Sequence, residues 1–152
     1  MAKISAYIKK FKGTNNLYKS FNEFDLKWLS LFDEELTDNV KRMFESVSYE
    51  MIFGDGYYNK KVLDDFIISL EDLLKIKNYS NINDYIKKYK GSIDIYKPYI
   101  EFDLEWLSLF DNKLTDNVRI EFDLISNERI YGNRYDIVLD DFIISLEKLI
   151  KN

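Results

Sequence analysis

The sequence predicts an all-α protein built from two similar four-helix units in tandem. Two stretches nearly repeat one another, FDLKWLSLFDEELTDNV at residues 24–40 and FDLEWLSLFDNKLTDNV at residues 102–118. The motif LDDFIISLE also begins twice, at Leu63 and at Leu139. Apolar residues recur mostly three and four positions apart, which is the helical period. We therefore divide the chain into repeat units at residues 1–78 and 79–152.

The first helix of each unit has one apolar face and a glycine stop. Ile4, Tyr7, Ile8 and Phe11 fall on a single helical face, and Gly13 follows where a C-terminal cap is expected. The matching residues of the second copy are Ile82, Tyr85, Ile86, Tyr89 and Gly91.

The second helix is predicted to begin near Ser20, because Ser20 and Glu23 have the spacing of a capping box. The second copy has Pro98 at the matching place, which suits a first helical position. The apolar residues that follow are Phe24, Trp28, Leu29, Leu31 and Phe32 in one copy, and Phe102, Trp106, Leu107, Leu109 and Phe110 in the other. We expect this helix to be the most buried element of each unit.

The third helix is predicted to start at a threonine cap, Thr37 or Thr115. Its apolar stripe in the first copy is Val40, Met43, Phe44, Val47 and Met51. The matching residues 118–125 (VRIEFDLI) alternate apolar and polar as a strand would. The alternative fold is therefore α+β, with a β-hairpin around Gly54 and Gly132 in each unit.

The fourth helix follows the 3.6-residue period most closely. Its apolar positions are Leu63, Phe66, Ile67, Leu70, Leu73 and Leu74, matched by Leu139, Phe142, Ile143, Leu146, Leu149 and Ile150. The polar residues 78–83 (NYSNIN) are interpreted as a short linker. Units joined so closely are expected to pack together about a pseudo-two-fold axis.

Composition restricts the function. The chain has no cysteine, no signal-peptide pattern and no apolar run of membrane-spanning length, which favours a cytoplasmic protein with no membrane partner. Its net charge is −5, with −1 on residues 1–78 and −4 on residues 79–152. A mildly acidic surface does not favour direct nucleic-acid binding but suits a basic protein partner.

The usual catalytic groups are missing from the sequence. Without histidine or cysteine there is no ordinary general base near neutral pH and no thiolate nucleophile. The pairs Asp64–Asp65 and Asp140–Asp141 are adjacent on a helix, so their carboxylates point about 100° apart and cannot share a metal ion. Ser69 and Ser145 are expected to bond to the preceding turn. We predict a protein that is not an enzyme, with no cofactor and no metal.

Two groups of residues are candidates for binding a partner. The first is an apolar pair in an acidic frame on the third helix of the second copy: Ile120, Glu121, Asp123, Leu124, Asn127 and Glu128. The alternative is that this face packs against the first copy. The second group lies in the turns after the third helices: Asp55, Tyr57, Tyr58, Tyr131, Arg134 and Tyr135.

Each unit resembles the colicin D immunity-like proteins. The resemblance rests on a lysine-flanked first helix (YIKKFKG, YIKKYKG), an LTDNV entry to the third helix, a tyrosine turn and the final LDDFIISLEDL or LDDFIISLEKL. It implies a small acidic helical bundle that blocks a bacterial nuclease toxin, here in a tandem form. We therefore predict an immunity protein that neutralises a toxin effector by occluding its active site. Alternatives are a phage-encoded inhibitor of a bacterial defence protein, a scaffold or self-assembly module, and an enzyme using carboxylates from both units.

Overall fold

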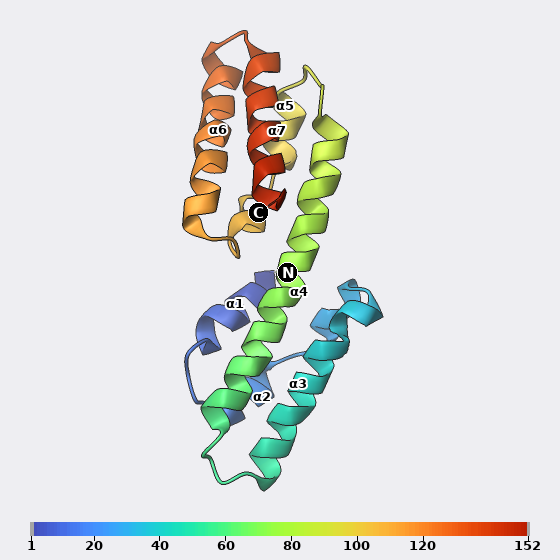
Figure 1. Cartoon of the computed structure of the whole chain (residues 1–152), viewed down its shortest axis with the longest axis vertical. Coiled ribbons are helices and arrows are strands. Elements are labelled where there is room, and N and C mark those ends of the chain that lie inside the picture. Colours follow the sequence, from blue (N-terminus) through green and yellow to red (C-terminus); the bar gives the residue numbers. More distant parts are fainter. Residues whose placement is uncertain (1, 152) are drawn as a thin grey trace. The chain divides into compact units, whose positions relative to one another are not determined.

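The computed structural model describes residues 2–151, and every regular element in that range is helical. The elements are α1 (Ala2–Phe11), α2 (Leu17–Glu23), the 3₁₀ helix η1 (Leu26–Leu31), α3 (Glu34–Phe53), α4 (Asn59–Tyr89), α5 (Tyr96–Glu101), the 3₁₀ helix η2 (Leu104–Leu107), α6 (Asn112–Tyr131) and α7 (Tyr135–Lys151) (Figure 1). The predicted all-α class is confirmed. No helix between residues 2 and 151 is both long and apolar enough to cross a membrane.

The alternative of a β-hairpin around Gly54 and Gly132 is wrong, because both glycines directly follow long helices. The alternating segment 118–125 belongs to α6. Val118 and Ile125, seven residues apart, point into the core, whereas Ile120 and Leu124 are exposed. The apparent strand pattern therefore arises from a helix that carries apolar residues on two faces.

The chain forms two compact units, residues 1–76 (unit 1) and 77–152 (unit 2), and the division falls inside α4. The predicted linker at 78–83 is wrong, since these residues are helical. No glycine or proline interrupts residues 59–89. Asn78 and Ile82 are also buried, so the polar stretch continues the helix instead of leaving it. The pseudo-two-fold relation stays a prediction.

Equivalent contacts stabilise the interior of each unit. In unit 1 the Tyr7 hydroxyl donates to the Ser20 carbonyl at 2.7 Å, and in unit 2 the Tyr85 hydroxyl donates to the Pro98 carbonyl at 2.5 Å. Phe66 and Phe142 are fully buried at the centres of matching ring clusters. The clusters comprise Tyr7, Phe24, Phe44 and Phe66 in unit 1 and Tyr85, Phe102, Phe122 and Phe142 in unit 2.

The second helix lies earlier in the chain than predicted. Asn16 caps α2 by accepting a hydrogen bond from the Lys19 backbone N–H at 3.3 Å, while Ser20 sits inside the helix and bonds to the Leu17 carbonyl. Pro98 is the third residue of α5, not the first. A polar residue that can cap a helix can also bond within one, so the serine spacing alone did not locate the start.

The apolar stretch after α2 is not a single buried helix. Phe24 is extended, and the Asp25 carboxylate accepts from the Lys27 backbone N–H at 2.9 Å to start η1. Asp103 does the same for η2. Leu31 is 71% exposed. The most buried elements are instead the predicted fourth helices, where Leu63, Phe66, Ile67, Leu70, Leu73 and Leu74 and their counterparts Leu139, Phe142, Ile143, Leu146 and Leu149 are all buried.

The remaining helix ends are partly as predicted. Gly13 and Gly91 have φ of 81° and 82°, so they end their helices in the left-handed conformation expected of a glycine cap. The third helices begin earlier than the threonines, after Asp33 and Asp111. Thr37 and Thr115 are buried in the first turn and bond to the carbonyls of Glu34 and Asn112.

Candidate protein-binding surfaces

The first predicted surface lies on α6 and exposes its apolar pair. Ile120 is 57% exposed and Leu124 is 46% exposed, one helical turn apart. Asp123 and Asn127 are exposed beside them, while Glu121 is half-buried. We call Ile120, Glu121, Asp123, Leu124 and Asn127 the α6 patch. Unit 1 has Arg42 and Ser46 in place of the apolar pair.

Glu128, the sixth residue of this predicted group, has a structural task. Its carboxylate folds over Gly132 and accepts a hydrogen bond from the Arg134 backbone N–H. A side chain at position 132 would collide with that carboxylate. Glu128 therefore fixes the turn from α6 into α7, and its charge is less available to a partner than that of Asp123.

A second acidic surface of unit 2 lies on α7, and the sequence reasoning missed it. The residues are Asp136, Ile137, Asp140, Asp141 and Ile144, all exposed, and we call them the α7 face. None of the three aspartates joins an ion pair among residues 2–151. The α7 face thus combines two exposed isoleucines with three unneutralised carboxylates.

The matching surface of unit 1 is neutralised. On α4 the Lys60 ammonium pairs with Asp64 at 2.9 Å, and Lys61 pairs with Asp65 at 3.3 Å. At an offset of 76 residues, Asp136 and Ile137 replace the two lysines. Comparing the repeats at this offset would have revealed the surface. The net charge of each unit would not have revealed it, because residues 1–76 carry −2 and residues 77–152 carry −3.

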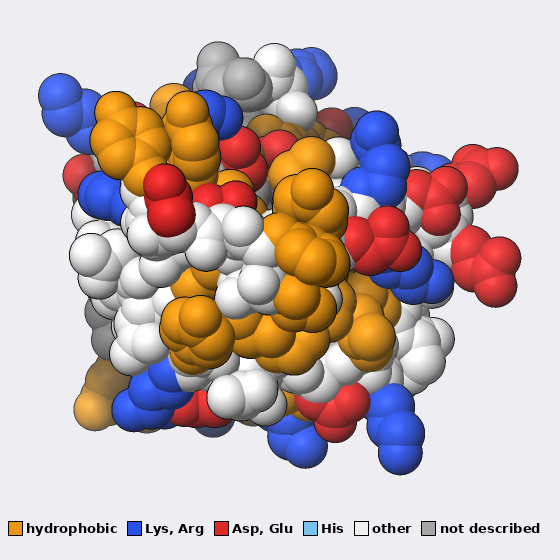
Figure 2. All heavy atoms as spheres, turned by 90° about the horizontal axis from the view of Figure 1, so that it is seen from below, with side chains coloured by type: hydrophobic (Ala, Val, Ile, Leu, Met, Phe, Trp, Pro, Cys, Tyr) orange, Lys and Arg blue, Asp and Glu red, His pale blue; other side chains and the backbone are white. Residues whose placement is uncertain are grey.

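The second predicted group occupies the α3–α4 turn of unit 1. Tyr57 and Tyr58 are exposed, with ring centroids 4.8 Å apart, and Asp55 stabilises the turn by accepting from the Tyr57 backbone N–H. Further exposed apolar side chains near this end are Tyr18, Tyr49, Ile52 and Phe53. Figure 2 looks onto this end and shows hydrophobic side chains gathered centrally, with charged groups around them.

Three of these four additional side chains could have been found from the helical period. On α3, Tyr49, Ile52 and Phe53 lie away from the stripe formed by Val40 and Val47, so they cannot join the same core. Tyr18 is placed beside them because its hydroxyl donates to the Met51 carbonyl at 3.1 Å.

The corresponding turn of unit 2 exposes one tyrosine of the predicted group instead of two. Tyr131 is 85% exposed and Arg134 is exposed, whereas Tyr135 is half-buried against Tyr96 with ring centroids 6.0 Å apart. The Tyr96 hydroxyl also donates to the Arg129 carbonyl. The hydrogen bond with Tyr96 raises the pKa of the Tyr135 hydroxyl.

The polar groups considered for catalysis have ordinary structural partners. The Ser69 and Ser145 hydroxyls donate to the carbonyls of Phe66 and Phe142, as predicted. No group of three or more carboxylates in residues 2–151 is arranged to hold a metal ion.

Comparison with known proteins adds no relative. No protein-family model matches the sequence, and neither the curated proteins nor the solved structures include a match.

Proposed function

We propose that this protein is a non-catalytic inhibitor that binds a basic protein and covers its active site, as an immunity protein does with a bacterial toxin. The observation that carries the proposal is the α7 face, where Asp136, Asp140 and Asp141 have no cationic partner in the described chain. A basic partner would supply the missing positive charges.

The apolar residues within both acidic surfaces support a protein as the partner. Ile137 and Ile144 lie on the α7 face, and Ile120 and Leu124 lie on the α6 patch. Interfaces combine a desolvated apolar centre with a polar rim, and complementary charge accelerates the encounter. A purely acidic surface would serve solubility alone, whereas exposed isoleucines among carboxylates give a partner area to bury.

Contrast between the repeats also supports the proposal. The core residues are nearly the same in both units, so packing does not require the change from Lys60 and Lys61 to Asp136 and Ile137. Each ion pair on an exposed helix contributes about 0.3–0.5 kcal/mol, so unit 2 forgoes a small stabilisation. A binding role for the α7 face would explain why unit 2 lacks these ion pairs, because unpaired carboxylates are available to a basic partner.

The experiment introduces lysines at positions 136 and 137 of unit 2, where they match Lys60 and Lys61 of unit 1. Asp136→Lys with Ile137→Lys should let positions 136 and 137 pair with Asp140 and Asp141 and should weaken binding of the partner about tenfold. Glu45→Lys with Ser46→Lys adds the same three positive charges to an exposed part of α3 and serves as the control. Each protein is used to capture partners from cells of its source, and bound proteins are identified by mass spectrometry.

The captured protein is then purified, titrated against each variant, and expressed with and without this protein. The proposal requires a basic protein that arrests growth when expressed alone, is silenced by co-expression, and loses affinity only for the α7 variant. Equal affinity for both variants would reject the α7 face. A partner whose activity is unchanged by saturating amounts of this protein would reject inhibition.

A further inference from the structure

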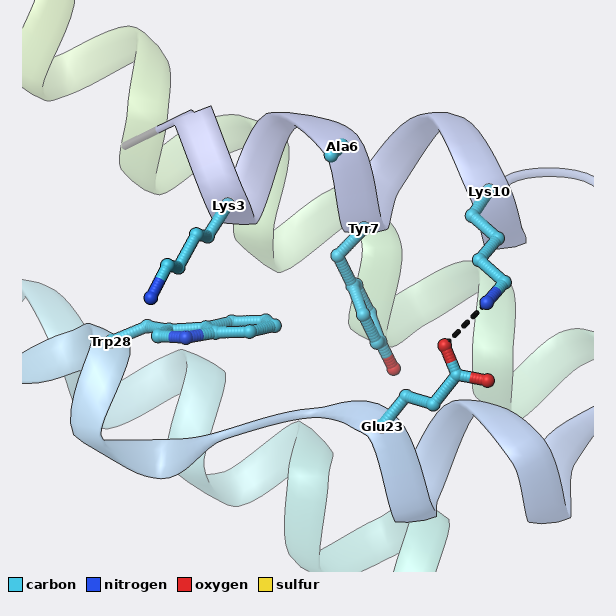
Figure 3. A pocket seen from close by; sticks show the side chains of 6 residues that line it. All are labelled: Lys3, Ala6, Tyr7, Lys10, Glu23 and Trp28. Carbon is cyan, nitrogen blue, oxygen red and sulfur yellow. Dashed lines mark hydrogen bonds and ion pairs between the residues drawn. The ribbon is translucent and has the colours of Figure 1, made fainter.

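Unit 1 contains an open hollow with a tryptophan on one side. It lies between α1 and the segment that follows α2, has a volume of about 360 Å³, and is lined by Lys3, Ala6, Tyr7, Lys10, Glu23 and Trp28 (Figure 3). The Trp28 indole makes edge-to-face ring contacts with Tyr7 at 5.9 Å and with Phe24 at 5.2 Å, which fix its position. A fixed, half-buried indole of this kind can stack against the flat side of a ligand.

The charges of the hollow do not balance. The Lys10 ammonium pairs with the Glu23 carboxylate at 2.5 Å, so these two charges satisfy one another. Lys3 joins no ion pair in the described chain, and its ammonium points toward the Trp28 indole (Figure 3). The Tyr7 hydroxyl is occupied by the Ser20 carbonyl, and burial raises its pKa, so it adds no negative charge. One positive charge is therefore left beside an apolar surface.

Unit 2 keeps the framework and reverses the charge. Tyr85 and Trp106 have the same ring separation of 5.9 Å, and Lys88 pairs with Glu101 at 2.6 Å. Asn81 replaces Lys3, and Asp84 replaces Ala6. The side chains corresponding to those of the hollow thus sum to −1 in unit 2, compared with +1 in unit 1.

We propose that the hollow of unit 1 binds an organic carboxylate with a flat apolar body. The apolar body would stack on Trp28 and the carboxylate would meet the Lys3 ammonium. A phosphate is a poorer fit, because tight phosphate binding uses several convergent donors and the hollow offers one unpaired cation. This site is separate from the acidic surfaces of unit 2 and does not depend on the proposed inhibitor function.

The two tryptophans provide an internal control for the test. The ¹⁵N-labelled full chain gives one indole N–H signal from Trp28 and one from Trp106, assigned with Trp28→Phe and Trp106→Phe. Titration with phenylacetate should shift the Trp28 signal saturably, with a Kd on the order of 1 mM, and the affinity at Trp106 should be about tenfold lower, because Asp84 repels the carboxylate and no lysine replaces Lys3. Absence of any Trp28 shift at tens of millimolar phenylacetate, or equal shifts of both signals, would overturn the proposal.

A neutral ligand, and variants in which residues are exchanged between the two repeats, test the role of the Lys3 charge. Phenylacetamide should bind about threefold more weakly, as expected for loss of one exposed ion pair. Lys3→Asn with Ala6→Asp should weaken binding at Trp28 about tenfold, because one attractive charge is lost and one repulsive charge is added, and Asn81→Lys with Asp84→Ala should strengthen binding at Trp106 by a similar factor. The rest of each spectrum reports whether the fold is intact. Equal affinity for the acid and the amide would overturn the role of Lys3.

The carboxylate could belong to a small acid or to the end of a peptide chain. The affinity of the tripeptide acetyl-Gly-Gly-Phe with a free carboxylate is compared with that of phenylacetate. For each acid, the affinity of the corresponding neutral amide is measured as the control. Tighter binding of the peptide acid than of phenylacetate identifies a chain end as the ligand, and the reverse identifies a small acid. Either result supports the site, provided that the corresponding amide binds more weakly.

Discussion

Units 1 and 2 have the same interior and different exteriors. Tyr7 and Tyr85 make matching hydrogen bonds, and Phe66 and Phe142 occupy matching ring clusters. Outside the core, Lys60 and Lys61 of α4 pair with the two neighbouring aspartates, whereas Asp136 and Ile137 at the matching positions leave the aspartates of α7 unpaired within the described chain. The difference teaches that the ring network is kept in both repeats, while substitutions at the surface give each copy its own distribution of charge.

The largest expected effect tests whether the two cores are equivalent. Phe66→Ala and Phe142→Ala each remove a fully buried ring and should each destabilise the protein by about 3–5 kcal/mol, because a cavity is left in a packed aromatic cluster. Urea denaturation followed by circular dichroism measures both. If one variant loses less than about 1 kcal/mol, the two interiors are not energetically alike.

A smaller effect concerns alkaline pH. Burial raises the pKa of both Tyr7 and Tyr85 well above that of an exposed tyrosine. The unfolded chain releases these protons near pH 10, so the tyrosines' contribution to stability is complete below that pH and is lost as pH rises toward the folded-state pKa. The free energy of unfolding should fall by up to about 1.4 kcal/mol per tyrosine for each pH unit above 10.

Denaturation at pH 8, 9, 10 and 11 measures this decline. Tyr7→Phe and Tyr85→Phe are the matched controls, and each should make the decline shallower while costing about 1 kcal/mol at neutral pH through the lost hydrogen bond. A decline that is unchanged in both phenylalanine variants would assign it to other groups.

The smallest effect sharpens the contrast between α4 and α7. Asp136→Lys with Ile137→Lys should raise stability by about a few tenths of a kcal/mol, because two new pairs with Asp140 and Asp141 at about 0.3–0.5 kcal/mol each exceed the loss of the Asp136 carboxylate from the first turn of the helix. Lys60→Ala with Lys61→Ala in α4 should lower stability by a similar amount, and 1 M NaCl should reduce both changes. Thermal denaturation at low and high salt is the measurement, and a destabilised lysine variant of α7 would contradict the comparison.

Helical periodicity predicted the interior well because burial has a strict period. The positions of Leu63, Phe66 and Leu70 and of their counterparts in α7 were correct, as were the glycine ends of the first helices. These features depend on local backbone geometry and on one apolar face, and residue types and their spacing indicate both.

Helix starts were harder to predict because several polar residues can cap a helix. Asn16, Ser20 and Asp25 are all suitable, and the chain uses the first and third as caps. Apolar spacing predicts one α-helix over the Phe24–Trp28 region, because it does not distinguish an α-helix from an extended residue followed by a 3₁₀ turn. The polar residues 78–83 suggested a linker, although no residue there obliges a helix to stop.

The candidate surfaces were only partly predictable. Ile120 and Leu124 were correctly placed off the core face of α6. The α7 face was missed because three aspartates at the start of a helix have an ordinary explanation in the helix dipole. Its distinguishing feature is that Asp136 and Ile137 stand where unit 1 has Lys60 and Lys61, and only a comparison of the repeats at an offset of 76 residues shows this.

The division between the units inside α4 has a consequence for taking the protein apart. Ile76 and Lys77 are consecutive residues of one uninterrupted helix, so a protease finds no extended segment to cleave there. A gene cut at that codon would give each fragment a severed helix end, with up to four backbone groups deprived of their bonds. Separating the duplicated halves therefore requires a cut through a helix, and each fragment would carry unbonded backbone groups at the new end.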